Sequence, residues 1–80
     1  MRLYLGGFFT FYVPAAQKKR SPWIEVELSE PALLPEVLER LGIPPAEVHL
    51  AAVNGQAVDP AEAIVNQDDE VRLYPPIGGG

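Results

Sequence analysis

The chain has 80 residues, enough for one small domain with a single modest hydrophobic core. It contains no cysteine, which excludes disulfides and thiolate chemistry. The net charge of −5 argues against a nucleic-acid partner, because binding to phosphate backbones needs a positive field. No apolar run approaches the ~20 residues that span a bilayer and no secretory signal is visible, so we expect a cytoplasmic protein with no membrane partner.

The first part of the chain is rich in strand-forming residues. Residues 2–5 predict a strand, which a pair of glycines then interrupts. Residues 8–13 are aromatic or β-branched throughout, so their composition predicts a strand. This segment either continues the first strand after a bulge or forms the second arm of a hairpin. Residues 14–22 predict a loop, and we interpret the basic cluster Lys18-Lys19-Arg20 within it as solvated.

Two regular patterns follow. In residues 23–28 apolar side chains alternate with polar or acidic ones, which predicts a strand with one buried face and one wet face. In residues 34–41 leucine and valine recur at i, i+3, i+4 and i+7, the spacing of one helical face. Pro35 suits the first turn of this helix, and Gly42 suits its end. Because the helix is amphipathic, we expect it to lie across one face of a sheet.

The second half of the chain predicts three further strands. Residues 49–53 and 56–58 flank an Asn-Gly pair, a strong hairpin signal because both residues tolerate a positive φ angle. Residues 59–65 predict an irregular connection, and residues 70–74 predict the last strand. A Pro-Pro-Ile-Gly-Gly-Gly segment then follows. The expected order is therefore β, β, α, β, short β, β and a tail.

This order and three short motifs resemble the ThiS/MoaD family of ubiquitin-like sulfur carriers. Residues 53–55, Val-Asn-Gly, are similar to the "VNG" hairpin of that family. Residues 68–71, Asp-Asp-Glu-Val, are similar to its "GDEV" turn, with aspartate in place of the glycine. Residues 73–80 resemble the "-PPV-GG" ending of the MoaD branch. Residues 7–13 depart from that branch, and residues 41–48 look more like a divergent ubiquitin-like domain that is often fused to a nuclease-like module.

The resemblance implies an α+β fold of the β-grasp, ubiquitin-like type. We expect a mixed sheet of four to five strands with one crossing helix in residues 1–74. Residues 75–80 are then expected to form a flexible, glycine-rich tail.

The resemblance also implies a chemistry. In this family an E1-like adenylyltransferase of the MoeB/ThiF type uses ATP and Mg to adenylate the C-terminal glycine. A sulfur donor then converts the carboxylate to a thiocarboxylate, which delivers sulfur to a MoaE-like or other acceptor synthase subunit. Gly80 would carry the reacting carboxylate, and Gly78 and Gly79 would let it enter a narrow channel, because glycine has no Cβ. The chain would thus be a carrier rather than an enzyme and would bind no cofactor itself.

The residues before the glycines are candidate docking residues. Tyr74 matches an aromatic docking position of MoaD-type carriers, and Pro75, Pro76 and Ile77 would add apolar contact area. The Pro-Pro-Ile ending favours molybdopterin biosynthesis over thiamine biosynthesis. We predict no metal site, because His49 is the only histidine and the acidic residues are scattered without ligand spacing.

Two other functions fit the same sequence. The first is a ubiquitin-like modifier joined to lysines through Gly80, because conjugation shares the adenylation step. The second is a non-enzymatic β-grasp interaction module whose tail is idle, since glycines are common at frayed termini.

Overall fold

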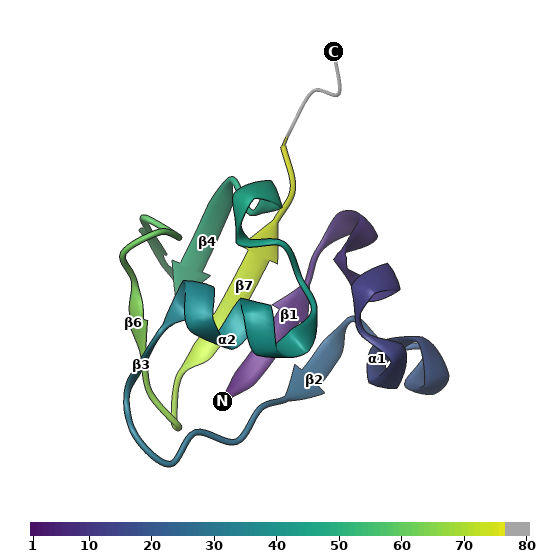
Figure 1. Cartoon of the computed structure of the whole chain (residues 1–80), viewed down its shortest axis with the longest axis horizontal. Coiled ribbons are helices and arrows are strands. Elements are labelled where there is room, and N and C mark those ends of the chain that lie inside the picture. The colour runs from purple at the N-terminus through teal and green to yellow at the C-terminus, as the bar shows by residue number, and fades with distance from the viewer. Residues whose placement is uncertain (77–80) are drawn as a thin grey trace.

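Residues 1–76 are described by a computed structural model, and they fold around a mixed sheet (Figure 1). Within these residues the sheet has five strands in the order β2-β1-β7-β4-β5. The central pair, β1 and β7, is parallel, and the other neighbours are antiparallel. The expected α+β β-grasp fold is confirmed. The strands are β1 (Arg2–Leu5), β2 (Trp23–Glu25), β4 (Leu50–Val53), β5 (Gln56–Val58) and β7 (Glu70–Tyr74).

The predicted amphipathic helix is α2 (Leu34–Leu41), which lies across one face of the sheet (Figure 1). Leu34, Val37 and Leu38 are completely buried, as their spacing predicts. Gly42 follows with a φ angle of 81°, a left-handed conformation that ends the helix. The helix buries its apolar stripe against the sheet and leaves its charged side chains in solvent.

The aromatic segment after β1 is helical, and both strand predictions for it are wrong. It forms a 3₁₀ helix, η1 (Gly7–Tyr12), and the predicted loop that follows contains the helix α1 (Pro14–Lys19). Phe9, Val13 and Ala16 are buried. Phe9 comes from η1, Val13 is the extended residue that joins the two helices, and Ala16 comes from α1. Burial of these side chains in the core therefore overrides the strand preference of the individual residues. These two helices project beside β1 and β2 (Figure 1). Residues 6–20, which contain both helices, are here called the insert.

A hydrogen bond fastens the insert to the rest of the fold. The Tyr12 hydroxyl donates to Glu47 Oε2 at 2.6 Å, which links η1 to the 3₁₀ helix η2 (Pro45–Glu47). The two ends of the insert continue into β1 and β2. The Tyr12 hydrogen bond thus anchors the middle of the insert, between its two helices.

The strand predicted for residues 23–28 is shorter than expected. Ile24, Val26 and Leu28 are buried, which confirms the alternation. β2 ends at Glu25, which pairs with Arg2, the first residue of β1, and beyond this pair the Met1 amino group and the Val26 N–H each donate to the other residue's carbonyl oxygen, at 2.7 and 2.8 Å. The chain thus keeps its inward and outward alternation beyond the end of the strand.

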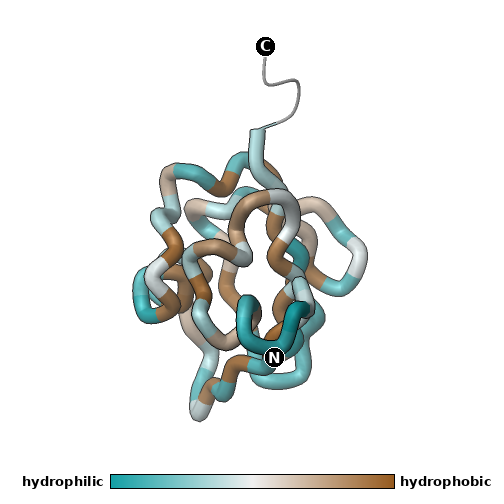
Figure 2. Tube along the Cα trace, turned by 90° about the vertical axis from the view of Figure 1, so that its right-hand side faces the viewer, coloured by the Kyte–Doolittle hydropathy of each residue, from teal (hydrophilic) through white to brown (hydrophobic). Residues whose placement is uncertain are grey.

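A second, two-stranded sheet was not predicted. β3 (Ala32–Leu33) pairs with β6 (Ile64–Val65), which lies in the connection expected to be irregular. Strands of two residues carry no readable period, so only the pairing reveals them. The inward positions of the five-stranded sheet form the centre of the core: Leu3 and Leu5 of β1 and Val71 and Leu73 of β7 are buried. Figure 2 shows hydrophobic residues interspersed with hydrophilic ones along the whole trace.

Candidate functional site

The end of β7, where the chain leaves the sheet, is the candidate site, and we call it the tail root (Tyr74–Pro76). The Gly6 N–H donates to the Leu73 carbonyl oxygen at 3.0 Å, and the His49 N–H donates to the Tyr74 carbonyl oxygen at 3.3 Å. Pro75 follows and has no N–H, so the ladder cannot continue. Backbone hydrogen bonds from both sides therefore hold β7 as far as Tyr74, and the chain then leaves the sheet at the two prolines (Figure 1).

Two glycines of the insert shape the tail root. A Cβ on Gly6 would lie 2.5 Å from the Leu73 carbonyl oxygen, which is closer than atoms can approach. Gly7 has a φ angle of 55°, and a Cβ there would lie 2.6 Å from Cγ of Pro75. The sequence predicts this pair as a strand interruption, and only the structure shows its contact with the tail root. The doubled glycine was the available signal, because such pairs often mark close backbone approach.

An aromatic surface covers the outer side of the sheet beside the tail root. Tyr4 is its centre, with ring centroids 5.2 Å from Trp23 and 6.0 Å from Tyr74. The Arg72 guanidinium lies 5.1 Å from the Trp23 ring centroid and 5.6 Å from that of Tyr4. Leu50 is opposite Tyr74 in the β4–β7 register and is 42% exposed. We call these five residues the aromatic face.

The predicted docking residues that the structure describes differ in their surroundings and in their exposure. Tyr74 belongs to the aromatic face, Pro75 is half-buried against Gly7, and Pro76 is exposed. Tyr4 and Trp23 are not predicted as their neighbours, although the alternation of the first strand places Tyr4 at an outward position. The other predicted site residues lie outside the described residues; they are Ile77, Gly78, Gly79 and Gly80.

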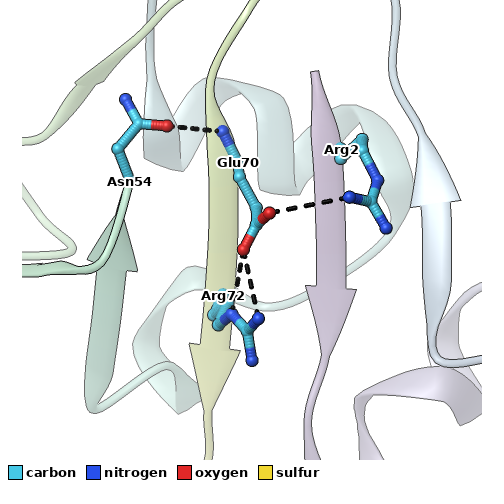
Figure 3. A network of polar contacts seen from close by, with 4 residues as sticks. All are labelled: Arg2, Asn54, Glu70 and Arg72. Carbon is cyan, nitrogen blue, oxygen red and sulfur yellow. Dashed lines mark hydrogen bonds and ion pairs between the residues drawn. The ribbon is translucent and has the colours of Figure 1, made fainter.

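The two family-like motifs meet at the other end of β7, away from the tail root (Figure 3). Asn54, with a φ angle of 52°, accepts the Glu70 N–H on its side-chain oxygen at 2.9 Å and donates to Asp69 Oδ1 at 2.9 Å. The Glu70 carboxylate in turn pairs with Arg72 at 3.1 Å and with Arg2 at 3.6 Å. These motif residues therefore align the hairpin with β7 and do not touch the tail root.

Asn54 is predicted to stabilise the fold in two separable ways. Asn54→Ala removes both side-chain hydrogen bonds and places a less tolerant residue in a left-handed conformation, which should cost about 2–3 kcal/mol in the free energy of unfolding. Asn54→Gly removes the same hydrogen bonds but adopts the left-handed conformation without strain, so it should lower the free energy of unfolding by about half as much. Urea denaturation measures both. Equal losses in the two variants would show that the left-handed conformation carries no cost.

The pKa of the Asp69 carboxyl lies below its ordinary value. Burial opposes its ionisation, but hydrogen bonds from the Asn54 side chain and from the Asn66 N–H outweigh that effect. Because the folded pKa is the lower one, Asp69 stabilises the fold above the ordinary Asp value of about 3.9, and this contribution is lost as pH falls through the folded value. We expect the stability of Asp69→Asn to fall less steeply than that of the native chain below about pH 5, in denaturation series at stepped pH. If the stability of the variant and of the native chain fell equally steeply with pH, this prediction would be contradicted. Asp68→Asn is the control for the loss of one carboxylate, because Asp68 is exposed.

Other kinds of site find no support in residues 1–76. In this part of the chain no group of three or more His, Cys, Asp or Glu side chains is arranged to hold a metal ion. Nor does any helix described there have the length and apolarity to cross a membrane. His49 contributes its backbone N–H to the tail root, and its side chain is exposed.

Comparison with known proteins agrees with the fold and with the motifs. A model of the ThiS family matches residues 11–80, which is most of the chain. A search of curated proteins gives no significant match. Members of this family are ubiquitin-like sulfur carriers rather than catalysts, and they interact with E1-like adenylyltransferases and synthase subunits. The chain belongs to the ThiS family.

Proposed function

We propose that this protein is a sulfur carrier of the MoaD type, with Gly80 as the carrying residue. Its carboxylate attacks the α-phosphate of ATP and releases pyrophosphate, and a sulfur donor then displaces AMP to leave a thiocarboxylate. The observation that supports this proposal is the tail root. Two neighbouring strands hold β7 as far as Tyr74, and two prolines that cannot pair then direct the chain away from the sheet.

The division of labour between the chain and its partner follows from the same geometry. The chain's part is to present the carboxylate, so we propose that it binds no cofactor, and that the E1-like adenylyltransferase holds ATP and Mg. The two prolines favour an extended backbone where the chain leaves β7, which suits a carboxylate that must reach a partner's pocket. Gly78 and Gly79 then give the carboxylate its reach into the partner's pocket.

The aromatic face is the proposed docking surface for these partners. Aromatic and arginine side chains dominate protein interfaces when they become fully desolvated. Tyr74 joins this face to the tail root, and Pro75, Pro76 and Ile77 extend the contact toward the glycines. A partner that holds the aromatic face therefore also receives the tail.

We propose molybdopterin biosynthesis, in the cytoplasm, as the pathway that receives the sulfur. The Pro-Pro-Ile spacer supports this choice over thiamine biosynthesis. A MoaE-like synthase subunit would then accept sulfur from Gly80.

Mass spectrometry of the intact chain tests the proposal. The purified protein is incubated with an E1-like enzyme, ATP, Mg and a sulfur donor. We expect a mass gain that corresponds to replacement of one oxygen by one sulfur, localised to Gly80 by fragmentation. A chain that never gains sulfur with either a MoeB-type or a ThiF-type enzyme is not a carrier. Sulfur transfer to a MoaE-like subunit but not to a thiazole synthase would support the molybdopterin pathway, and the reverse would overturn it.

Tyr74→Ala is expected to weaken docking more than it weakens the fold. Loss of a central interface aromatic costs about 2 kcal/mol, which corresponds to a roughly thirtyfold lower kcat/KM for adenylation. The loss should appear mainly in KM, because Tyr74 lies six residues before the reacting carboxylate in the sequence. Tyr74→Phe keeps the ring and should retain most of the activity. If both variants match the native chain, the aromatic face is not the docking surface.

A further inference from the structure

The charges of this chain are segregated along the sequence. All 11 acidic residues lie in residues 25–80, which carry two arginines, so this part has a net charge of −9. Residues 1–24 contain Arg2, Lys18, Lys19 and Arg20 and no acidic residue, so their net charge is +4. Three of these four cations are exposed at the end of the insert. The insert is thus a positive edge on an acidic molecule.

A groove of about 520 Å³ lies beside this positive edge, between the insert and the end of β1. Its apolar part includes the buried side chains of Leu5 and Ala16. The ring of Phe11 lines it while remaining 74% exposed, although a side chain of this kind is normally covered. The groove therefore offers apolar area for one large side chain, next to positive charge.

The shape of the groove is fixed by contacts within the insert. The Gln17 side-chain amide donates to the Phe11 carbonyl oxygen at 2.8 Å and to the Thr10 carbonyl oxygen at 3.3 Å, which ties α1 to η1. All three residues line the groove. A preformed groove of this kind binds with little ordering cost.

Arg20 lines the same groove in a conformation that favours glycine. It follows α1 with a φ angle of 54°, the left-handed position at which helices commonly end in glycine. A charged residue therefore occupies a position where glycine would be less strained. The backbone strain at Arg20 is consistent with selection for its positive charge at the rim of the groove.

The groove also adjoins the proposed docking surface. Tyr4 lines the groove and is the centre of the aromatic face. Gly7 lines the groove and contacts Pro75 of the tail root. The groove, the aromatic face and the tail root therefore form one continuous surface, which a single partner protein could cover.

We propose that this groove binds an acidic segment of a protein partner, with one aromatic or large aliphatic side chain inserted beside Phe11. Lys18, Lys19 and Arg20 then pair with the carboxylates that flank this side chain. A single-stranded nucleic acid is the weaker match, because the rest of the chain carries a net charge of −9 and repels a polyanion along its length. The proposal concerns the groove alone and does not depend on the sulfur chemistry.

Titration of the full ¹⁵N-labelled chain, followed by NMR, tests the groove directly. The probe is a blocked hexapeptide with one phenylalanine among aspartates and glutamates, and its control has asparagine and glutamine in place of the acids. We expect saturable shifts at Phe11, Gln17 and Arg20 with the acidic peptide, a dissociation constant below about 1 mM and at least tenfold weaker binding of the control. Equal binding of the two peptides, shifts elsewhere, or no saturable shift would overturn the proposal.

Charge variants separate the groove from general electrostatics. Lys18→Glu with Lys19→Glu should weaken peptide binding about tenfold or more, whereas Arg40→Glu, on the exposed side of α2, should leave it within about twofold. Arg20→Gly should weaken binding while the melting temperature stays equal or rises, so the loss cannot be ascribed to unfolding. Equal effects at Arg40 and in the insert would overturn the proposal. So would a single-stranded oligodeoxynucleotide that binds the groove more tightly than the acidic peptide.

Discussion

Deletion of Gly79 and Gly80 is expected to abolish thiocarboxylate formation and to leave the melting temperature unchanged. The two residues span at most about 7 Å, so their loss withdraws the carboxylate by that distance from the α-phosphate of ATP. Misplacement by even 1 Å can cost about 10²-fold in rate, which makes a loss below detection the expected result. The hydrogen bonds and the core described above involve residues 1–76 and remain in place.

The measurement is mass spectrometry of the intact chain after the complete reaction, with thermal denaturation of the same sample. Gly78→Ala is the matched control, because it retains the full length and adds only a Cβ. It should react more slowly than the native chain but far faster than the deletion. Undiminished sulfur gain in the deletion variant would refute the proposed role of Gly80. A deletion variant that keeps its cellular function would instead favour the interaction module.

Gly6→Ala is expected to lower the free energy of unfolding by about 3 kcal/mol, within the range for overpacked sites. Gly6 has a φ angle of −69°, which alanine adopts without strain. The whole cost therefore comes from the Cβ that would lie 2.5 Å from the Leu73 carbonyl oxygen. Either β1 moves away from β7 or the hydrogen bond from the Gly6 N–H is lost, and both changes disturb the tail root.

Gly55→Ala is the matched control for this variant. Gly55 has a φ angle of 84°, but no atom lies within 4 Å of an added Cβ. It should therefore cost about 1 kcal/mol, from the left-handed backbone conformation alone. Urea denaturation compares the two variants directly. If Gly6→Ala is no more destabilising than Gly55→Ala, the close approach at Leu73 does not constrain the tail root.

Part of this fold could be read from the sequence because some elements carry a local signal. The stripe from Leu34 to Leu41, with Gly42 after it, predicted α2 and its end. The Asn54-Gly55 pair located the hairpin, and the alternation in residues 70–74 located β7. Each of these signals depends on the spacing of neighbouring residues, which the sequence displays directly.

Other parts depend on contacts between residues that are distant in the sequence. Residues 8–13 have the composition of a strand, yet Phe9 is buried from a 3₁₀ helix and Val13 from the extended residue that follows it. The pairing of β3 with β6 joins two-residue strands that lie about thirty positions apart. No local pattern can report either arrangement.

The sequence by itself determined the family-like motifs, the amphipathic helix and the tail as the candidate functional segment. The tertiary structure decided where those features lie: Asn54 and Asp69 align one end of β7, and Tyr74 lies at the other end beside Tyr4 and Gly6. It also revealed a groove next to the positive edge of the insert. The physical reason is that spacing along the chain encodes local structure, whereas the surroundings of a tail root or a groove arise only when distant segments pack together.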